Sequence, residues 1–360
     1  MPFATLFSNV AAKLFGGAPA GGAGAVEPEL VQLAVEAVVD AVDPRLRSVS
    51  GYARKLAPGM ASTITHMRAL ARDMPAPIPL SRGAWGSDPL LNAMFAAADD
   101  VPAMLGRSEE LRVFFEAPAN AALGEAHALL GALKAERNVL APAIVNGQLR
   151  QDVAQTTVNF SGHKVIAPGA DFMACRREVG MRILRRLAEL ALARITTVGA
   201  RATALEQRKA LLGARLRMLN LRRGGLQDIA GPAHDEAAEI ASIENELKAT
   251  VENYVEAKAS LATLESRIEH INAIFTAPAD FVSYTRVALR VNRMGYKVAA
   301  GADEQASDLM LGELSIGAGL KAVIVFVLCP RAELPARESL GARAARQGLP
   351  LVAIGGITLE

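Results

Sequence analysis

The sequence predicts an α+β fold that is predominantly helical, with a long antiparallel coiled-coil helical hairpin inserted in a small β-containing head. Three observations predict it. Apolar residues recur about every 3.5 residues between 181 and 275, strand-like segments flank that stretch on both sides, and helical periodicity runs through residues 27 to about 140. The predicted parts are an amphipathic peptide with a Gly/Ala tether (1–25), a helical N-terminal unit (26–140), the β-containing head (141–172 and 276–335), the hairpin (173–275) and a C-terminal helix–strand tail (336–360).

Composition excludes several classes of protein. The chain has 360 residues, of which 51% are hydrophobic but only 4% aromatic, so the mean hydropathy of +0.22 reflects alanine rather than large apolar side chains. A net charge of +2 with 21% charged residues fits neither wholesale disorder nor a general coating of nucleic acid. The basic residues are 30 Arg and 9 Lys, which together with the alanine content is typical of a GC-rich bacterial genome.

Cysteine usage and apolar runs indicate the compartment. Cys175 and Cys329 are too few for a disulfide framework or a cysteine zinc site, so we expect two buried free thiols in a reducing cytosol. The longest apolar run, 322–329, has the length of a buried strand and is far shorter than a membrane helix. Because the first residues lack the pattern of a secretory signal, we expect a cytoplasmic protein, with peripheral membrane association as an added possibility.

The first fifteen residues form an amphipathic pattern, followed by a Gly/Ala-rich tether at 16–25. We expect this peptide to dock on a protein partner or a membrane surface. The alternatives are that it folds back on its own chain or frays. Its single lysine, Lys13, argues against strong attraction to anionic lipid. The residues expected to make the contact are Phe3, Leu6, Phe7, Val10 and Leu14.

Residues 27 to about 140 are predicted to be helical with short breaks. A first helix precedes Asp43, and the Pro-rich connector 74–80 cannot be helical because each proline removes a donor. Ser87 and Ser108 are the expected N-caps of two helices. The further helices are expected at about 46–73, 88–97, 108–117 and 119–136.

Strand signals lie on either side of the hairpin. An Asn-Gly turn is expected at 146–147, and segments 156–160 and 164–167 read as a β-hairpin across the turn 161–163. We expect these strands to share one sheet with the later ones, because short strands need each other's edges. The later strands are predicted at 281–289, 295–298, 311–316 and 322–328.

Two seams of apolar residues with alternating steps of three and four define the hairpin. They are separated by a glycine-containing link of roughly ten residues, which favours an antiparallel pair of helices. Lys209 interrupts the first seam and predicts a register-specifying residue or a local break. The first seam is Met181, Leu184, Ala188, Ala191, Ile195, Val198, Ala202, Leu205, Lys209, Leu212, Leu216 and Leu219; the second is Ile240, Ile243, Leu247, Thr250, Tyr254, Ala257, Leu261, Leu264, Ile268, Ile271 and Phe275.

The charges of the two arms are opposite. Residues 176–223 hold 13 Arg or Lys against 3 Glu, a balance of +10, whereas residues 233–271 hold 9 Asp or Glu against 3 Lys or Arg, a balance of −6. The arms should therefore pair with each other in preference to pairing with their own kind.

No motif names a reaction. The sequence has no phosphate-binding loop, and the segment 317–319 is better read as a turn than as a dinucleotide fingerprint, since no helix follows it. The five histidines are scattered singly, and Cys175 has no assignable base. We therefore assign no catalytic, cofactor-binding or metal-binding residue.

The C-terminal segment 342–360 resembles the late helix, strand and phosphate-binding turn of thiamine-phosphate-synthase-type barrels. The resemblance implies phosphate contacts from the backbone of Gly355 and Gly356. It covers about 20 of the 360 residues, and the rest of an eight-stranded barrel is absent, so no activity is inferred from it.

A stripe of arginines supplies the alternative function. Arg201, Arg208, Arg215 and Arg222 recur every seven residues beside the first seam. They are expected to meet the acidic arm, and the alternative is a phosphate-reading stripe that binds nucleic acid. We expect a non-enzymatic scaffold or adaptor that acts through the hairpin and is tethered by the N-terminal peptide. An enzyme with a site dispersed over the head is the third hypothesis.

Overall fold

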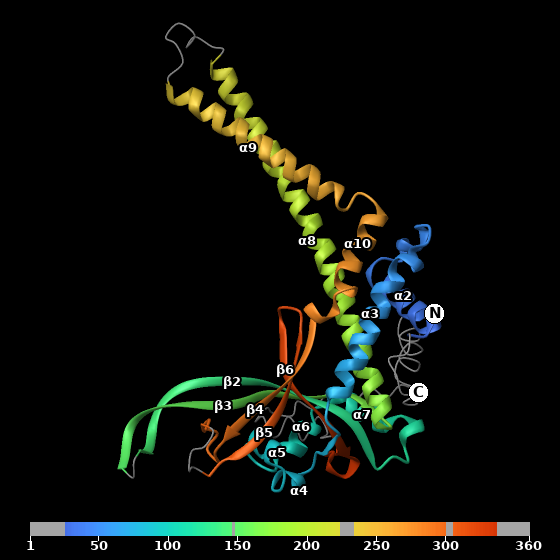
Figure 1. The fold of residues 1–360 in the computed structure, drawn as a ribbon, viewed down its shortest axis with the longest axis vertical. Coiled ribbons are helices and arrows are strands. Elements are labelled where there is room, and N and C mark those ends of the chain that lie inside the picture. The colour runs from blue at the N-terminus through green and yellow to red at the C-terminus, as the bar shows by residue number, and fades with distance from the viewer. Residues whose placement is uncertain (1–25, 146–147, 224–233, 300–304, 337–360) are drawn as a thin grey trace, which may run out of the picture. The chain divides into compact units, whose positions relative to one another are not determined.

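The computed structural model describes residues 26–145, 148–223, 234–299 and 305–336, and it is a mixed α/β fold (Figure 1). Of the structure, 56% is helical and 26% is strand, which agrees with a predominantly helical α+β chain. The chain divides into two compact units. Among the described residues, the first comprises 26–72, 180–223, 234–283 and 316–319, and the second comprises 73–145, 148–179, 284–299, 305–315 and 320–336.

Helices account for most of the described residues. The α-helices are α2 (Pro28–Val42), α3 (Tyr52–Asp73), α4 (Arg82–Trp85), α5 (Pro89–Met94), α6 (Asp100–Leu105), α7 (Glu109–Glu116), α8 (Phe172–Arg223), α9 (His234–Ala259) and α10 (Leu264–Phe275). The short 3-10 helices are η1 (Pro44–Ser48), η2 (Pro118–Asn120), η4 (Pro278–Asp280) and η5 (Arg331–Glu333). The strands are β1 (Ile78–Pro79), β2 (Glu125–Val145), β3 (Gln148–Gly169), β4 (Val282–Val291), β5 (Ser307–Ile316) and β6 (Leu320–Pro330).

The strands before and after α8–α10 share one sheet, as predicted. Its order is β3-β2-β6-β5-β4, and the two-residue β1 adds a parallel pair at β6. Single bridges from Tyr296 to Thr157 of β3 and from Lys297 to Val291 of β4 link the two outer strands. The turn between β5 and β6 contains Gly317 at φ +59°, a conformation that favours glycine, so the expectation of a turn at 317–319 is confirmed.

Two predictions for the strands β2 and β3 are wrong. A helix was expected at 119–136, but residues 125–136 form the start of β2, where alanines that favour a helix are buried in pairing with β3 and β6. The β-hairpin expected across 161–163 is one continuous strand, β3. Gly162 has φ +64° and lies at a register shift, so its left-handed backbone makes a β-bulge rather than a turn. Val145 pairs with Gln148, while the Asn-Gly pair between them lies outside the described residues.

Helices α4–α7 pack on the sheet within the second unit. Leu91, Leu105 and Leu111 are fully buried in a core with Ala128 and Val327 of the strands. Burying such leucines contributes about 2 kcal/mol each relative to exposure.

The N-caps in this region follow the prediction in part. Ser108 caps α7 by accepting the N–H of Leu111, as expected. The cap of α5 is Asp88, which accepts the N–H groups of Leu90 and Leu91, rather than the neighbouring Ser87. A carboxylate one residue closer to the helix satisfies two free donors at once.

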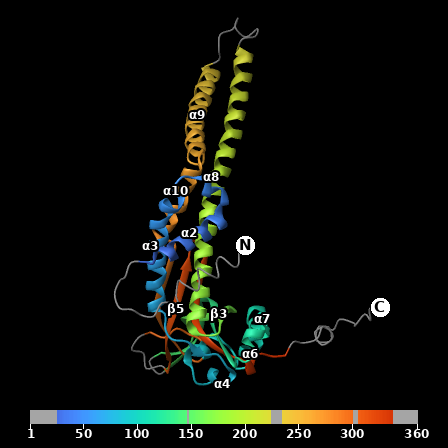
Figure 2. The same ribbon diagram turned by 90° about the vertical axis from the view of Figure 1, so that its right-hand side faces the viewer.

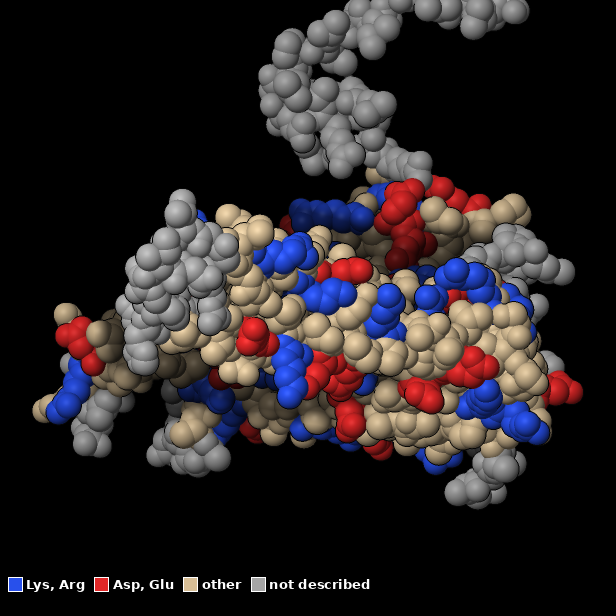
Figure 3. All heavy atoms as spheres, turned by 90° about the horizontal axis from the view of Figure 1, so that it is seen from above, with Lys and Arg blue, Asp and Glu red and all other residues tan. Residues whose placement is uncertain are grey.

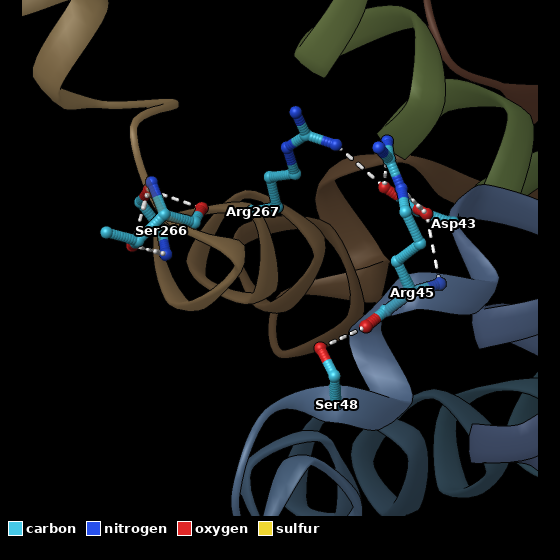
Figure 4. A network of polar contacts seen from close by, with 6 residues as sticks. Asp43, Arg45, Ser48, Ser266 and Arg267 are labelled. Carbon is cyan, nitrogen blue, oxygen red and sulfur yellow. Dashed lines mark hydrogen bonds and ion pairs between the residues drawn. The ribbon is translucent and has the colours of Figure 1, made fainter.

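In the first unit, η1 and α3 dock on α10. Asp43 caps η1 by accepting the N–H and guanidinium of Arg45, and it also binds Arg267 of α10 at 2.7 Å (Figure 4). The buried hydroxyl of Thr63 in α3 donates to the carbonyl of Phe275 at 2.8 Å. These contacts fix α10 by both ends.

The second helical arm is divided, which corrects the expectation of one uninterrupted helix. Helix α9 ends at Ala259 and α10 begins at Leu264, although the apolar seam continues through the break. A reciprocal capping box between Thr263 and Ser266 starts α10. By contrast α8 runs without a break for 52 residues, about 78 Å at 1.5 Å per residue.

Candidate interaction surface on the helical arms

Helix α9 crosses α8 at an angle in Figure 1, and the two helices run alongside each other in Figure 2. Every residue of the two apolar seams is buried or half-buried, and most residues between the seam positions of α8 beyond residue 191 are exposed. The burial therefore follows the 3.5-residue spacing along both arms. Leu212 of α8 and Ile240 and Ile243 of α9 are among the buried seam residues.

Ion pairs join the basic arm to the acidic arm. Arg208 of α8 binds Glu246 of α9, and Arg215 binds Glu239 at 2.5 Å. The four side chains are exposed by 40 to 62%, so each pair contributes about 0.5 kcal/mol and selects the register more than it adds stability. As residue numbers rise along α8 they fall along α9, so the two helices run in opposite directions.

Lys209, the charged residue in the first seam, is accommodated by an aromatic side chain. Its ammonium lies 4.6 Å from the ring centroid of Tyr254, a seam residue of α9. Lys258 covers the same ring at 5.2 Å and donates to the Tyr254 hydroxyl at 2.9 Å. Two cations at one ring make this level of the arms different from the aliphatic levels around it.

A histidine holds the break between α9 and α10. Nδ1 of His270 accepts from Arg194 of α8 at 3.4 Å, which leaves Nε2 as the donor to the carbonyl of Ser260 at 3.1 Å. Leu261 lies in the break, with its Cδ1 3.7 Å from where a Cβ would stand on Gly199 of α8. Side chains of α8 and α10 thus fix the position of the break.

The structure separates the four arginines of the predicted stripe. Arg208 and Arg215 are used in ion pairs with α9, as the pairing interpretation expects. Arg201 and Arg222 are exposed, and neither forms an ion pair with another described residue. On the face drawn in Figure 3, basic and acidic side chains lie interspersed rather than gathered by sign.

Several predicted residues lie outside the described part of the chain. They are the candidate docking residues Phe3, Leu6, Phe7, Val10 and Leu14, and the glycines Gly355 and Gly356.

A buried charge cluster in the sheet was not foreseen from the sequence. Glu313 of β5 is 6% exposed and lies between Lys134 of β2 at 2.6 Å and Lys321 of β6 at 3.0 Å. The contact with Lys134 is a close charge pair rather than a well-directed hydrogen bond, because Oε1 of Glu313 has no partner of good hydrogen-bond geometry. Glu136 then joins Lys134 at 3.4 Å to Lys297 at 3.1 Å.

The cluster holds its carboxyl groups ionised. Burial opposes ionisation of Glu313, but the two lysines outweigh it and bring its pKa below the ordinary value. Likewise the hydrogen bond from Lys297 lowers the pKa of Glu136. Each buried charge is thus compensated by a neighbour of opposite sign, as a structural ion-pair network requires.

The thiols and one histidine have clear environments. Cys175 and Cys329 are buried thiols that form no disulfide, as predicted, and burial raises the pKa of Cys329 to about 12, with a smaller contribution from Cys175. His163 is not the solvated turn residue expected from the sequence. It stacks on Phe95 with ring centroids 4.6 Å apart, and burial lowers its pKa.

Among the described residues, no group of three or more His, Cys, Asp or Glu side chains is placed to hold a metal ion. None of the described helices is both long and apolar enough to cross a membrane. No protein-family model, curated protein or solved structure matches this chain.

Proposed function

We propose that this chain is a non-enzymatic scaffold or adaptor that acts through protein–protein contacts of a coiled-coil hairpin. Helix α8 is one arm of that hairpin, and α9 with α10 is the other. The observation that carries the proposal is that every residue of both 3.5-residue seams is buried or half-buried. The N-terminal peptide 1–15 is proposed as a tether to a partner or membrane surface.

The outer surface of the arms supports a binding role. Beyond residue 199 the arms present their outward residues to solvent, and Leu211, Met218 and Leu221 of α8 are 60 to 77% exposed. Aliphatic side chains in line on an exposed helix are typical of a surface that packs against another helix.

Crosslinking in native lysate, followed by mass spectrometry, tests the proposal. Four forms are compared: the full chain, Leu211→Gln with Leu221→Gln, a matched control in which the exposed Val113 of α7 becomes Gln, and a chain that starts at Val26. We expect a specific partner with the full chain and the control, and its loss with the arm variant. Loss with the Val26 form assigns the tether to residues 1–25. Equal recovery by the arm variant and the full chain contradicts the hairpin as the binding surface.

Nucleic-acid binding through α8 is the second candidate, and the exposed Arg201 and Arg222 are the observation in its favour. They are 21 residues apart, about 32 Å along the helix, and the two stripe arginines between them, Arg208 and Arg215, bind α9. This function predicts retention on heparin that falls steeply with salt and is lost in Arg201→Gln with Arg222→Gln. Retention unchanged by that double variant contradicts it.

A further inference from the structure

Each arm carries its own exposed apolar stripe. The α8 stripe consists of Leu211, Met218 and Leu221, exposed by 70%, 60% and 77%, and the α9 stripe consists of Val251 and Val255, exposed by 37% and 59%. Steps of seven and three place the α8 residues on one side of their helix, and a step of four does the same for α9. These aligned side chains form two narrow apolar surfaces.

The two stripes cannot cover each other within one chain. At 100° per residue, the α8 stripe is turned by roughly 150° from the seam that faces α9. It therefore lies on the side of α8 away from its partner arm. The α9 stripe is turned by roughly 90° from its own seam, on the flank of that helix.

The exposed charges that form no ion pair among the described residues are mainly basic on α8, apart from Glu206, and mainly acidic on α9, apart from Lys248 and Lys258. On α8, three arginines are exposed and form no ion pair with another described residue: Arg201, Arg217 and Arg222. On α9 the same holds for three acidic side chains, which are Glu244, Glu252 and Glu256. Between residues 207 and 222, α8 has no acidic residue at all.

We propose that the arms mediate self-association, with the α8 stripe of one copy packed on the α9 stripe of a second copy. This inference rests on the proposed function and names the partner. Contact between two α8 stripes would bring arginines together, whereas an α8 stripe on an α9 stripe joins Arg217 and Arg222 to the glutamates of α9. The stripes are small, so the association is weak and weakens further with salt.

Sedimentation velocity of the full chain tests this at about 50 mM and about 500 mM salt, where screening lengths differ about threefold. We expect a mass that rises with protein concentration at low salt and less so at high salt. Arg217→Glu with Arg222→Glu, and separately Glu252→Lys with Glu256→Lys, should each remain monomeric. An equimolar mixture of the two variants should associate again, since the exchanged charges are complementary. Val113→Gln serves as the control and should behave as the wild type.

Three results overturn the inference: a wild-type chain that is monomeric at every concentration, a mixture that stays monomeric, or association that disappears on nuclease treatment. An amine-reactive crosslink between Lys209 and Lys258, both within 5.2 Å of the Tyr254 ring, monitors pairing of the arms in the same samples. If the wild type is monomeric but still forms this crosslink within one chain, the result contradicts self-association and leaves the proposed function standing. Loss of the crosslink in the wild type contradicts the hairpin and with it the proposed function. Circular dichroism confirms that each variant remains folded.

Discussion

Lys209 of α8 lies over the ring of Tyr254 of α9, with its ammonium 4.6 Å from the ring centroid. The sequence marks Lys209 as the one charged residue of an apolar seam, and the structure pairs it with the only aromatic seam residue on α9. A cation over an aromatic face is stabilising even where both groups are half-buried.

A double-mutant cycle measures this pair. Lys209→Met keeps most of the stem and removes the charge, so we expect a loss of about 0.5–1 kcal/mol in the free energy of unfolding. In a Tyr254→Leu background the same substitution should cost much less. Equal cost in both backgrounds, measured by urea denaturation, would show that the two side chains are not coupled.

Two glycines should respond oppositely to alanine. At Gly199 of α8 a Cβ meets nothing closer than 3.7 Å, so Gly199→Ala should stabilise by about 1 kcal/mol through helix propensity. At Gly59 of α3 a Cβ would stand 3.1 Å from Cβ of Phe275 and 3.2 Å from Oδ1 of Asn272. Gly59→Ala should therefore destabilise by about 1–2 kcal/mol, because α3 and α10 must move apart. Thermal melts of the two variants should shift in opposite directions.

Acid should weaken the contact of η1 with α10. Hydrogen bonds from Arg45, and then from Arg267, bring the pKa of Asp43 below its ordinary value. Because the folded-state pKa is the lower one, this stabilisation is present above the unfolded value of about 4 and is lost as pH falls through the folded-state pKa. Asp43→Asn should thus cost stability at pH 7 and little at the acid end. Urea denaturation of wild type and variant at both pH values checks this. A stability difference between the two proteins that is as large in acid as at pH 7 would contradict this role of the Asp43 carboxylate.

Removing one member of the buried charge cluster should cost more than removing two. Glu313→Gln leaves the largely buried Lys134 without its closest counter-charge and should destabilise by about 3 kcal/mol. The double variant Lys134→Met with Glu313→Leu replaces the pair by apolar groups and should recover most of that loss. A double variant as unstable as the single one would indicate that the site does not tolerate apolar packing.

The seams show where sequence reasoning succeeds. Steps of three and four identify most of the buried and half-buried side chains of α8 beyond residue 191 and of α9, including the half-buried Lys209, because a single partner helix covers one face of each. Nearer its start α8 also buries residues outside the seam, such as Ile183 and Leu187. The break at 260–263 leaves the spacing intact, since Leu261 and Leu264 continue it, and only the capping pair Thr263 and Ser266 signals a new start.

The sheet shows where the sequence is insufficient. Strand β2 is rich in residues that favour helices, and it is a strand because β3 and β6 supply its hydrogen bonds from distant parts of the chain. For the same reason the pairing of Lys134 with Glu313 has no local signal, as the two residues are 179 positions apart.

The break held by His270 has a consequence for the length of the arms. Beyond Gly199 and Leu261, α8 and α9 contact each other through a repeat of seven residues, while α10 is fixed separately to α3 and η1. Removal of one heptad from each of α8 and α9 would therefore shorten each helix by about 10 Å and leave the seam in register on both sides of the cut. The length of α8 and α9 can therefore change in whole heptads while the contacts of α10 with α3 and η1 stay the same.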